Sequence, residues 1–210
     1  MSVRNLDFAG PFFHVKYILN EGAFSVAEKG IVFNLAEKPI VIRGQGLGFF
    51  KSTVVTNIAI EDIERCLVIE DFERTTDQDV LFERIKKKWT LVYEATKVER
   101  HRGVQLYRSP KIKLGNLEVN MCFAEGIPLN VGLHRTHWGD KPFMEVHTQI
   151  LGYGRMQQYR EQDLSTLYRE DPMSPGCTHE PMYDKDCVYP WHQYETTTKA
   201  VFMATEMQLD

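Results

Sequence analysis

The sequence predicts a mainly β fold, either a β-sandwich or a barrel, from three observations. Most of the chain consists of short β-branched or aromatic runs that end at Gly, Asn, Pro or charged residues, as strands joined by turns do. One segment alone has a clear helical pattern, so alternating βαβ units are not indicated. The chain has 210 residues, 43% of them hydrophobic, which suffices for a substantial core. We therefore expect a sandwich or barrel with an N-terminal strand extension and one or two helices.

The runs form an N-terminal and a C-terminal series of strands. In the first series, strands are expected at Phe12–Leu19, Gly30–Leu35, Pro39–Arg43, Ser52–Ile60, Cys66–Ile69, Gln105–Tyr107 and Asn116–Ala124. In the second series, they are expected at Leu129–Thr136, Phe143–Leu151, Gly154–Tyr159, Val188–Tyr194 and Ala200–Glu206. We interpret residues 1–210 as one domain, with N-terminal strands and a helix in 1–125 and a barrel core in 126–210.

The helix is expected from about Asp77 to Lys88. Its start combines an N-cap with acidic residues in the first turn, and apolar residues then follow at near-helical spacing. After it, Trp89–Val98 is rich enough in β-formers that a strand starting near Trp89 is an equal alternative. Residues 161–187 form a long segment, a lid or a surface excursion, with a short helix expected near Asp163.

Glycines indicate two turns. Gly152-Tyr-Gly154 is typical of a hairpin turn. Gly44-Gln-Gly46-Leu-Gly48 is better explained as a turn between strands than as a phosphate-binding loop, because neither a Lys-Ser/Thr at Walker spacing nor a helix pattern follows it.

Composition limits the partners. The net charge of −4 and the isoelectric point near 6.0 argue against nucleic acid, which requires a basic excess. The sequence has no apolar stretch of membrane-spanning length, and its N-terminus has no apolar signal segment, so a cytoplasmic protein is expected. Its four cysteines are widely spaced and are expected to be free thiols, with Cys66 and Cys122 in the core.

A polar stripe gives the best functional clue. Glu145, His147 and Gln149 lie at i, i+2 and i+4, so a strand would direct all three side chains to one face. Such a face is unusual unless it lines a pocket. Five of the seven histidines lie between His134 and His192, in the same part of the chain.

Two short stretches here resemble the paired motifs of the cupin superfamily. The spacing from Glu145 to Gly152 resembles the latter half of the first motif, and Pro190-Trp-His192 resembles the second; together they cover about residues 130–206. The resemblance implies a jelly roll whose interior holds a divalent metal, Fe, Mn, Ni or Zn. It implies that Glu145 is the carboxylate ligand and His192 an imidazole ligand.

The motif-one histidine position would be filled by His134 or His137. These two are separated by i, i+3, so a regular strand can direct only one of their rings into the pocket. His147 is a further candidate ligand that the motif does not require. Imidazole and carboxylate donors suit Fe, Mn, Ni or Zn, and three protein ligands would leave positions open for substrate.

The predicted function is therefore a metal-dependent enzyme acting on a small polar molecule, such as an oxo acid, a sugar derivative or an oxygenated intermediate. Tyr194 and Gln149 are expected to orient the substrate, and Glu180 to act as an acid or base. A homodimer paired through edge strands is expected.

Three alternatives stay open. A non-catalytic jelly-roll protein could use the same residues to bind a ligand or to assemble, and a metal-free enzyme could resemble jelly-roll sugar epimerases. The third alternative is a closed structural zinc site formed by Cys177, His179, Cys187 and His192.

Overall fold

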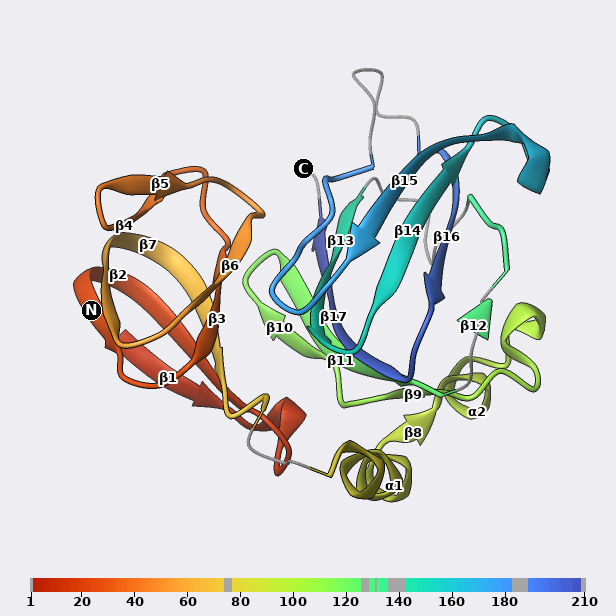
Figure 1. Cartoon of the computed structure of the whole chain (residues 1–210), viewed down its shortest axis with the longest axis horizontal. Helices are drawn as coiled ribbons and strands as arrows, with labels where there is room; N and C mark the ends of the chain where they lie inside the picture. The colour runs from red at the N-terminus through yellow and green to blue at the C-terminus, as the bar shows by residue number, and fades with distance from the viewer. Residues whose placement is uncertain are drawn as a thin grey trace.

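The computed structural model describes residues 2–73, 77–125, 129–130, 132–135, 143–182 and 189–208. They form two β lobes that lie side by side, an N-terminal lobe in red to orange and a C-terminal lobe in green to blue (Figure 1). All strand pairs are antiparallel. The predicted class, a mainly β fold of jelly-roll type, is confirmed. No helix among the described residues is long and apolar enough to cross a membrane.

The N-terminal lobe is one sheet in the order β1-β2-β7-β3-β6, with a small hairpin beside β7. Its strands are β1 (Ser2–Leu6), β2 (His14–Val26), β3 (Gly30–Asn34), β4 (Ile40–Ile42), β5 (Gln45–Leu47), β6 (Ser52–Val55) and β7 (Ile58–Glu70). A 3₁₀ turn, η1 (Asp7–Ala9), follows β1. The glycine-rich segment is the β4–β5 turn, as predicted, with positive φ at Arg43 and Gly44.

Several predicted strand boundaries in this lobe are wrong. The strand expected over 12–19 is β2, which continues to Val26. The expected strand over 52–60 is divided at Asn57, whose φ of 47° turns the chain between β6 and β7. The expected strand over 66–69 is the end of the 13-residue β7. Strand β7 pairs with β2 over its length and with β3 over its second half, and these long-range pairings hold its charged residues in the strand.

The C-terminal lobe consists of two sheets that face each other. The first has the order β13-β17-β11-β9-β8, with β10 beside β11, and the second has the order β12-β16-β14-β15. The strands of the first sheet are β8 (Thr90–Leu91), β9 (Leu106–Arg108), β10 (Ile112–Leu114), β11 (Leu117–Ala124), β13 (Phe143–Leu151) and β17 (Ala200–Gln208). Those of the second are β12 (Leu129–Asn130), β14 (Gly154–Tyr159), β15 (Leu167–Met173) and β16 (Trp191–Thr196). Strands β8–β11 thus belong to the barrel, which extends well before the expected start at residue 126.

The predicted helix is confirmed as α1 (Gln78–Lys88). The Asp77 carboxylate caps it by accepting a hydrogen bond from Val80 N at 3.1 Å, and the buried face carries Leu81, Phe82 and Ile85. After Trp89, where a strand was an equal alternative to more helix, the chain forms the two-residue strand β8, a short helix α2 (Val92–Thr96) and the 3₁₀ turn η2 (Glu99–His101).

The turn at Gly152 does not form the predicted hairpin, because β13 and β14 lie in different sheets. The chain passes there from one sheet to the other beside the β16–β17 connection, and Thr197 N donates to Tyr153 O at 3.0 Å. Gly152 has φ +68°, and a Cβ on it would lie 2.1 Å from Lys199 O. The glycine is needed because two corners of the jelly roll touch at this point.

The described part of the segment 161–187, residues 161–182, is more regular than predicted. The expected short helix is the 3₁₀ turn η3 (Leu164–Thr166), whose start is capped by Asp163. The structure then adds β15 to β14 as an edge strand, which tolerates Pro172 because a ladder bond is needed on one side only. Residues 183–188 lie outside the described residues.

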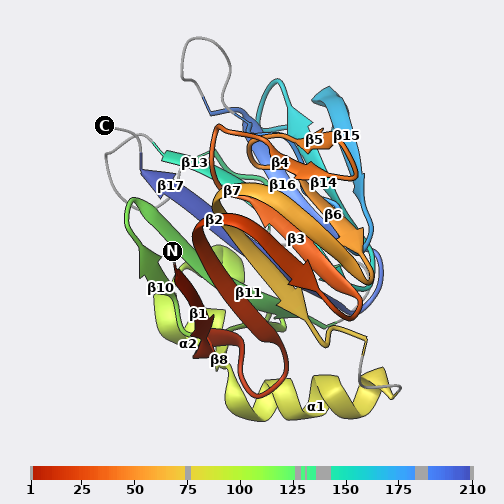
Figure 2. The same ribbon diagram turned by 90° about the vertical axis from the view of Figure 1, so that its left-hand side faces the viewer.

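The two faces of the β13-β17-β11 sheet have different partners. One face packs on the N-terminal sheet, where Phe33 and Leu67 join Met121, Phe123 and Met203 in a single buried cluster (Figure 2). The opposite face turns toward the β16-β14 sheet. Because strand side chains alternate, residues next to these core positions must point between the two sheets of the C-terminal lobe.

Candidate functional site

A cavity of about 140 Å³ lies between the two sheets of the C-terminal lobe. Its lining combines an apolar wall with histidine, arginine and glutamate side chains. It is lined by Val92, Arg100, His101, Leu106, Arg108, Asn120, Cys122, His134, Glu145, His147, His192, Tyr194, Phe202, Ala204 and Glu206. Cavities of this kind, apolar with a few converging polar groups, are where small ligands bind.

Strand β13 directs two of the predicted ligands into this cavity. Glu145 and His147 line it, whereas Val146 and Ile150 point the other way into the core shared with the N-terminal lobe. In the register with β17, His147 lies opposite Ala204, whose small side chain leaves space in front of the imidazole. Two of the three residues of the expected polar stripe therefore face a pocket, whereas Gln149 does not line it.

His134 and His192 meet at the cavity from two different segments. Their backbones form an isolated antiparallel bridge, with N···O distances of 3.0 and 2.9 Å, and their ring centroids are 4.3 Å apart. Nδ1 of His134 is 2.9 Å from Gly132 O, and Nδ1 of His192 is 3.0 Å from Pro190 O. A carbonyl oxygen only accepts, so each Nδ1 is the protonated nitrogen and each Nε2 carries the lone pair. His137 lies outside the described residues.

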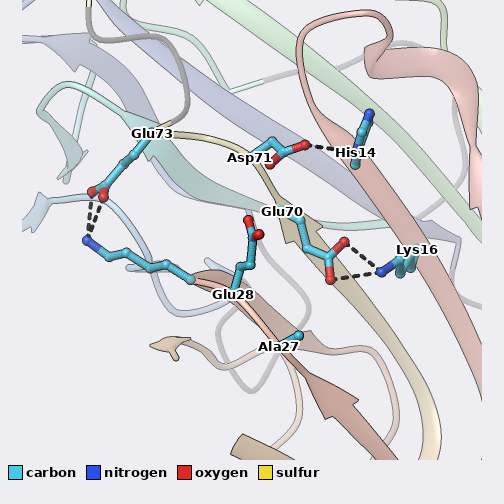
Figure 3. Close-up of a pocket in the computed structure, with 8 residues that line it drawn as sticks. His14, Lys16, Ala27, Glu28, Glu70, Asp71 and Glu73 are labelled. Atoms are coloured by element: carbon cyan, nitrogen blue, oxygen red, sulfur yellow. Dashed lines mark hydrogen bonds and ion pairs between the residues drawn. The ribbon is translucent and has the colours of Figure 1, made fainter. Parts of the chain in front are cut away.

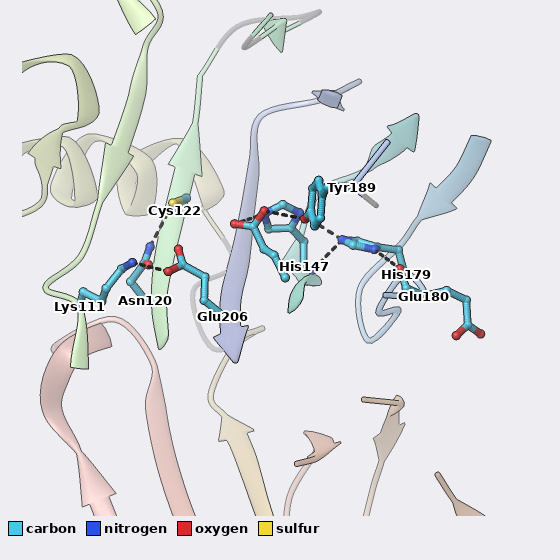
Figure 4. Close-up of polar contacts among 9 residues, drawn as sticks. Lys111, Asn120, Cys122, His147, His179, Glu180, Tyr189 and Glu206 are labelled. Carbon is cyan, nitrogen blue, oxygen red and sulfur yellow. Dashed lines mark hydrogen bonds and ion pairs between the residues drawn. The ribbon is translucent and has the colours of Figure 1, made fainter. Parts of the chain in front are cut away.

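His147 is held by a buried histidine behind it, His179. The backbone N–H of His147 donates to His179 Nε2 at 2.8 Å, and His179 Nδ1–H donates to Glu180 O at 2.7 Å (Figure 4). Burial above all, and then His147, lower the pKa of His179 from 6.5 to about 3, so its ring is neutral. Because His179 Nε2 bears no proton, the 3.2 Å contact to His147 Nδ1 is donated by His147. The lone pair of His147 is then on Nε2, 3.7 Å from Glu145 Oε1.

Glu145 is the carboxylate of the cluster. It is 6% exposed, and its Oε2 lies 3.4 Å from the hydroxyl of Tyr189, which donates to it. Arg100 also lines the cavity; burial lowers its pKa, and the negative charge of Glu145 partly offsets that effect. Glu145 thus has a neutral donor in Tyr189 and a cation in Arg100, while its register partner on β17 is a second carboxylate residue, Glu206.

The three residues predicted to act on the substrate have different positions. Tyr194 lines the cavity, packs against Phe202 at 4.5 Å between centroids, and donates its hydroxyl to Gln149 Oε1. Burial raises the pKa of Tyr194, so the hydroxyl keeps its proton. Gln149 is completely buried and donates its amide to Leu151 O at 2.8 Å, behind the cavity wall.

Glu180 lies on the surface, away from the cavity. It pairs with Lys51 of the N-terminal lobe, and Figure 4 shows its carboxylate pointing away from the histidines. The acid–base role predicted for it therefore has no structural support.

The alternative zinc set does not assemble among the described residues. His179 uses both ring nitrogens in hydrogen bonds, and Cys177 is exposed with its Sγ 3.2 Å from Ser174 Oγ. Cys187 lies outside the described residues. Cys66, Cys122 and Cys177 are free thiols, as predicted.

Among the described residues, the cluster has the donor types of a metal site but not the spacing of one. Neutral imidazoles with Nε2 lone pairs and a carboxylate, all lining one cavity, are donors that Fe, Mn, Ni and Zn accept. Among the described residues, no three His, Cys, Asp or Glu side chains already stand at the mutual spacing of a metal cluster. The donor set fits a divalent metal chemically, and a bound ion would have to draw the donors together.

Sequence reasoning missed the two arginines of the cavity. Arg108 follows Leu106 by two positions in β9, so the apolar Leu106 and the charged Arg108 share the cavity face. That spacing was the available clue, but the predicted strand ended at Tyr107. Arg100 belongs to η2, which was not predicted. Cys122 also lines the cavity, and burial raises its pKa to about 12, so it is not a nucleophile at neutral pH.

A second hollow, on the N-terminal lobe, is larger but is occupied by its own ion pairs. Figure 3 shows Lys16 facing Glu70 and His14 facing Asp71. The Lys16–Glu70 ion pair is 2.6 Å long, His14 lies 2.9 Å from Asp71, and Lys29 pairs with Glu73 at 2.7 Å. These side chains satisfy one another, so the C-terminal cavity is the better candidate site.

No protein-family model and no curated protein matches this sequence. Solved structures of cupin proteins do match. A cupin 2 conserved barrel domain protein from Leptotrichia buccalis is 10% identical with a TM-score of 0.35, covering 99% of this chain and 88% of its own. Salicylate 1,2-dioxygenase from Pseudoaminobacter salicylatoxidans is 9% identical with a TM-score of 0.38, covering 98% and 73%.

An RmlC-like cupin from Desulfovibrio desulfuricans is 12% identical with a TM-score of 0.34, covering 49% of this chain and 81% of its own. The chain is therefore similar to cupin proteins, as its sequence motifs predicted. Similarities this low carry no argument about activity, which must come from the cavity itself.

Proposed function

We propose that this protein is a metal-dependent enzyme that acts on a small polar molecule in the C-terminal cavity. The divalent metal would be held by His134, Glu145, His147 and His192. The observation that carries the proposal is the shared tautomer of the three histidines. Each directs its Nδ1–H at a protein acceptor, so that each has Nε2 in the lone-pair form that a metal ion needs.

This pattern is the usual support of metal-binding histidines, whose second ring nitrogen donates to a carbonyl or another protein group. Two of the acceptors are backbone carbonyls, and the third is His179, itself held by Glu180 O. The chain therefore fixes ring orientation from behind in all three cases. Donors oriented in this way lose little freedom when an ion binds.

The proposed site would be catalytic rather than structural. A bound divalent metal would supply Lewis-acid polarisation of a substrate oxygen, or activation of a bound water. The chain provides the enclosure: Tyr194 and Phe202 form an apolar wall, and the hydroxyl of Tyr194 is held by Gln149. At about 140 Å³, the cavity has room for about five water-sized groups, so the substrate is small.

Metal analysis of protein purified without chelator tests the proposal. We expect close to one equivalent of Fe, Mn, Ni or Zn in the wild type, and a loss of most of it in His192→Ala and Glu145→Gln. His14→Ala is the matched control, because His14 is an exposed histidine on the other lobe and should leave the metal content unchanged.

Two results would contradict the metal site. One is a wild-type protein that contains no metal and takes up none of these ions when they are added. The other is bound metal that survives both substitutions. Zinc lost from Cys177→Ser and Cys187→Ser but retained in Glu145→Gln would instead support the structural zinc alternative.

A further inference from the structure

We infer that the substrate of this site is a small organic carboxylate, and that Arg100 and Arg108 bind its carboxylate group. This inference rests on the proposed function for the chemistry, but the anion site itself is defined by the two arginines. Neither residue is part of the proposed metal-binding set.

The β-sheet register places Arg108 on the cavity face. Arg108 lies opposite Cys122 in β11, and Cys122 lies opposite Phe202 in β17, so the three side chains form one row across the sheet. The order β9-β11-β17-β13 puts Arg108 three strands from His147. The row of Arg108 continues to Gln149, two residues from His147. At about 4.8 Å per strand and about 3.4 Å per residue, the backbones of Arg108 and His147 are about 16 Å apart in a flat sheet, which an arginine, a histidine and a ligand of a few atoms together can span.

The two guanidinium groups have no hydrogen-bond or ion-pair partner among the described residues, although the charge of Glu145 acts on Arg100. Neither the Arg100 nor the Arg108 side chain makes such a bond there, and Arg100 Nε is buried without a hydrogen-bond partner. By contrast, the neighbouring exposed Arg102 pairs with Glu99 at 2.7 Å. Both arginines are half-buried, and a partly desolvated guanidinium without a hydrogen-bond partner is costly, so an anion between them would recover charge-assisted hydrogen bonds.

The electrostatics of the cavity agree with this geometry. Burial lowers the pKa of Arg100, and the pKa of His101 falls to about 4 through burial first and then the charges of Arg100 and Arg108. His101 therefore adds no positive charge, and the positive potential is concentrated on the two guanidinium groups. Glu206, the other carboxylate residue of the lining besides Glu145, is already paired with Lys111 at 2.8 Å.

The cavity favours a carboxylate over larger anions. The planar fork of a guanidinium matches the two oxygens of a carboxylate. A volume of about 140 Å³ suits an acid of about three or four carbons. A dianionic phosphate ester would be bulkier, and its second charge would be repelled by Glu145.

Isothermal titration calorimetry with three probes tests the inference: pyruvate, its neutral amide pyruvamide, and inorganic phosphate. Each is titrated into protein dialysed against EDTA and into protein reloaded with metal. We expect pyruvate to bind in both states, at least about tenfold more tightly than pyruvamide or phosphate. Arg100→Met and Arg108→Met should each weaken pyruvate binding about tenfold or more while leaving the metal content unchanged.

Arg102→Met is the matched control, since it removes an exposed arginine from the same segment and should not change pyruvate binding. Ala204→Leu provides a second test that leaves every charge in place, because its side chain would fill the space opposite His147 and should abolish binding. Circular dichroism and thermal unfolding establish that each variant is folded.

The inference is overturned if the wild type binds no pyruvate in either metal state, if pyruvate binding survives both arginine substitutions, or if phosphate binds as tightly as pyruvate. Pyruvate binding that requires metal and is lost only with His192→Ala also overturns it, because the acid would then bind the ion alone. None of these results changes the conclusion drawn from the metal content of the protein. Conversely, a protein without metal that binds pyruvate through the two arginines would reject the metal site and retain the anion site.

Discussion

The clearest test of how the site is built is to remove His179, the buried histidine behind His147. His179 is 3% exposed and joins the backbone N–H of His147 to Glu180 O through its two ring nitrogens. His179→Ala would leave the His147 N–H without an acceptor in the interior and would create a cavity where the ring was. It would also remove the acceptor for His147 Nδ1–H, so the His147 ring would lose its fixed orientation.

The expected loss of stability follows from these contacts. An unpaired buried N–H costs about 1–3 kcal/mol, and the cavity raises the total to about 3–5 kcal/mol. For a protein of this size that corresponds to a decrease in Tm of about 6–20 °C. His179→Gln should recover part of the loss, because its amide oxygen can accept the bond from His147 N. If His147 binds metal, His179→Ala should also weaken metal affinity by about 10- to 100-fold.

Urea and thermal unfolding followed by circular dichroism measure the first effect, and metal titration of the folded variants measures the second. His14→Ala serves as the control: its side chain is 64% exposed and should cost less than about 1 kcal/mol. The reasoning is refuted if His179→Ala costs less than about 1 kcal/mol. A large loss of stability with unchanged metal affinity would show that His179 supports the fold but does not position His147.

Two further predictions concern pH and the jelly-roll corner. The pKa of His101 is lowered from 6.5 to about 4, so the unfolded chain binds a proton that the folded protein does not. The contribution of His101 to the free energy of unfolding should be fully present above pH 6.5 and should decrease by about 2–3 kcal/mol as the pH falls to 4, where the lower figure allows for solvent screening. In urea unfolding, His101→Gln should show a smaller decrease with falling pH than the wild type. Parallel pH profiles of the two proteins would contradict the assignment. Gly152→Ala should lower the free energy of unfolding by at least about 2 kcal/mol, because of the φ of +68° and the contact of the new Cβ with Lys199 O. Gly22→Ala is the control and should cost less than about 1 kcal/mol, because a Cβ at Gly22 would contact no other atom. Equal costs would contradict this account of the corner.

Local patterns predicted the parts of the structure that depend on local geometry. The alternation of Glu145 and His147 required only that β13 be a strand with one buried face, and both residues line the cavity. The cap at Asp77 acts within four residues, so the start of α1 was predicted within one residue. The i, i+3 spacing of His134 and His137 predicted that one strand could direct only one of the two rings inward. The structure places the His134 ring at the cavity, and His137 lies outside the described residues.

Contacts between distant segments could not be predicted in this way. The pattern at Gly152 is the same for a hairpin and for a passage between sheets, and only the pairing of β13 with β17 and of β14 with β16 distinguishes them. His179 is 32 residues from His147, and nothing in its neighbourhood indicated that its ring accepts a backbone hydrogen bond. Arg100 enters the cavity from a 3₁₀ turn, which has no periodicity to detect.

The layering of the two lobes explains why the polar groups gather in one cavity. The β13-β17-β11 sheet has an N-terminal sheet against one face, where Val146, Met121 and Met203 belong to the shared core. Polar side chains on that face would have no water and few partners, so the alternation of each strand leaves them the opposite face. Because Glu145 and His147 occupy part of that face, apolar side chains do not fill it. Small residues such as Ala204 keep space open in front of them. The N-terminal lobe therefore supports the site without lining it, by fixing which face of the shared sheet is free to carry chemistry.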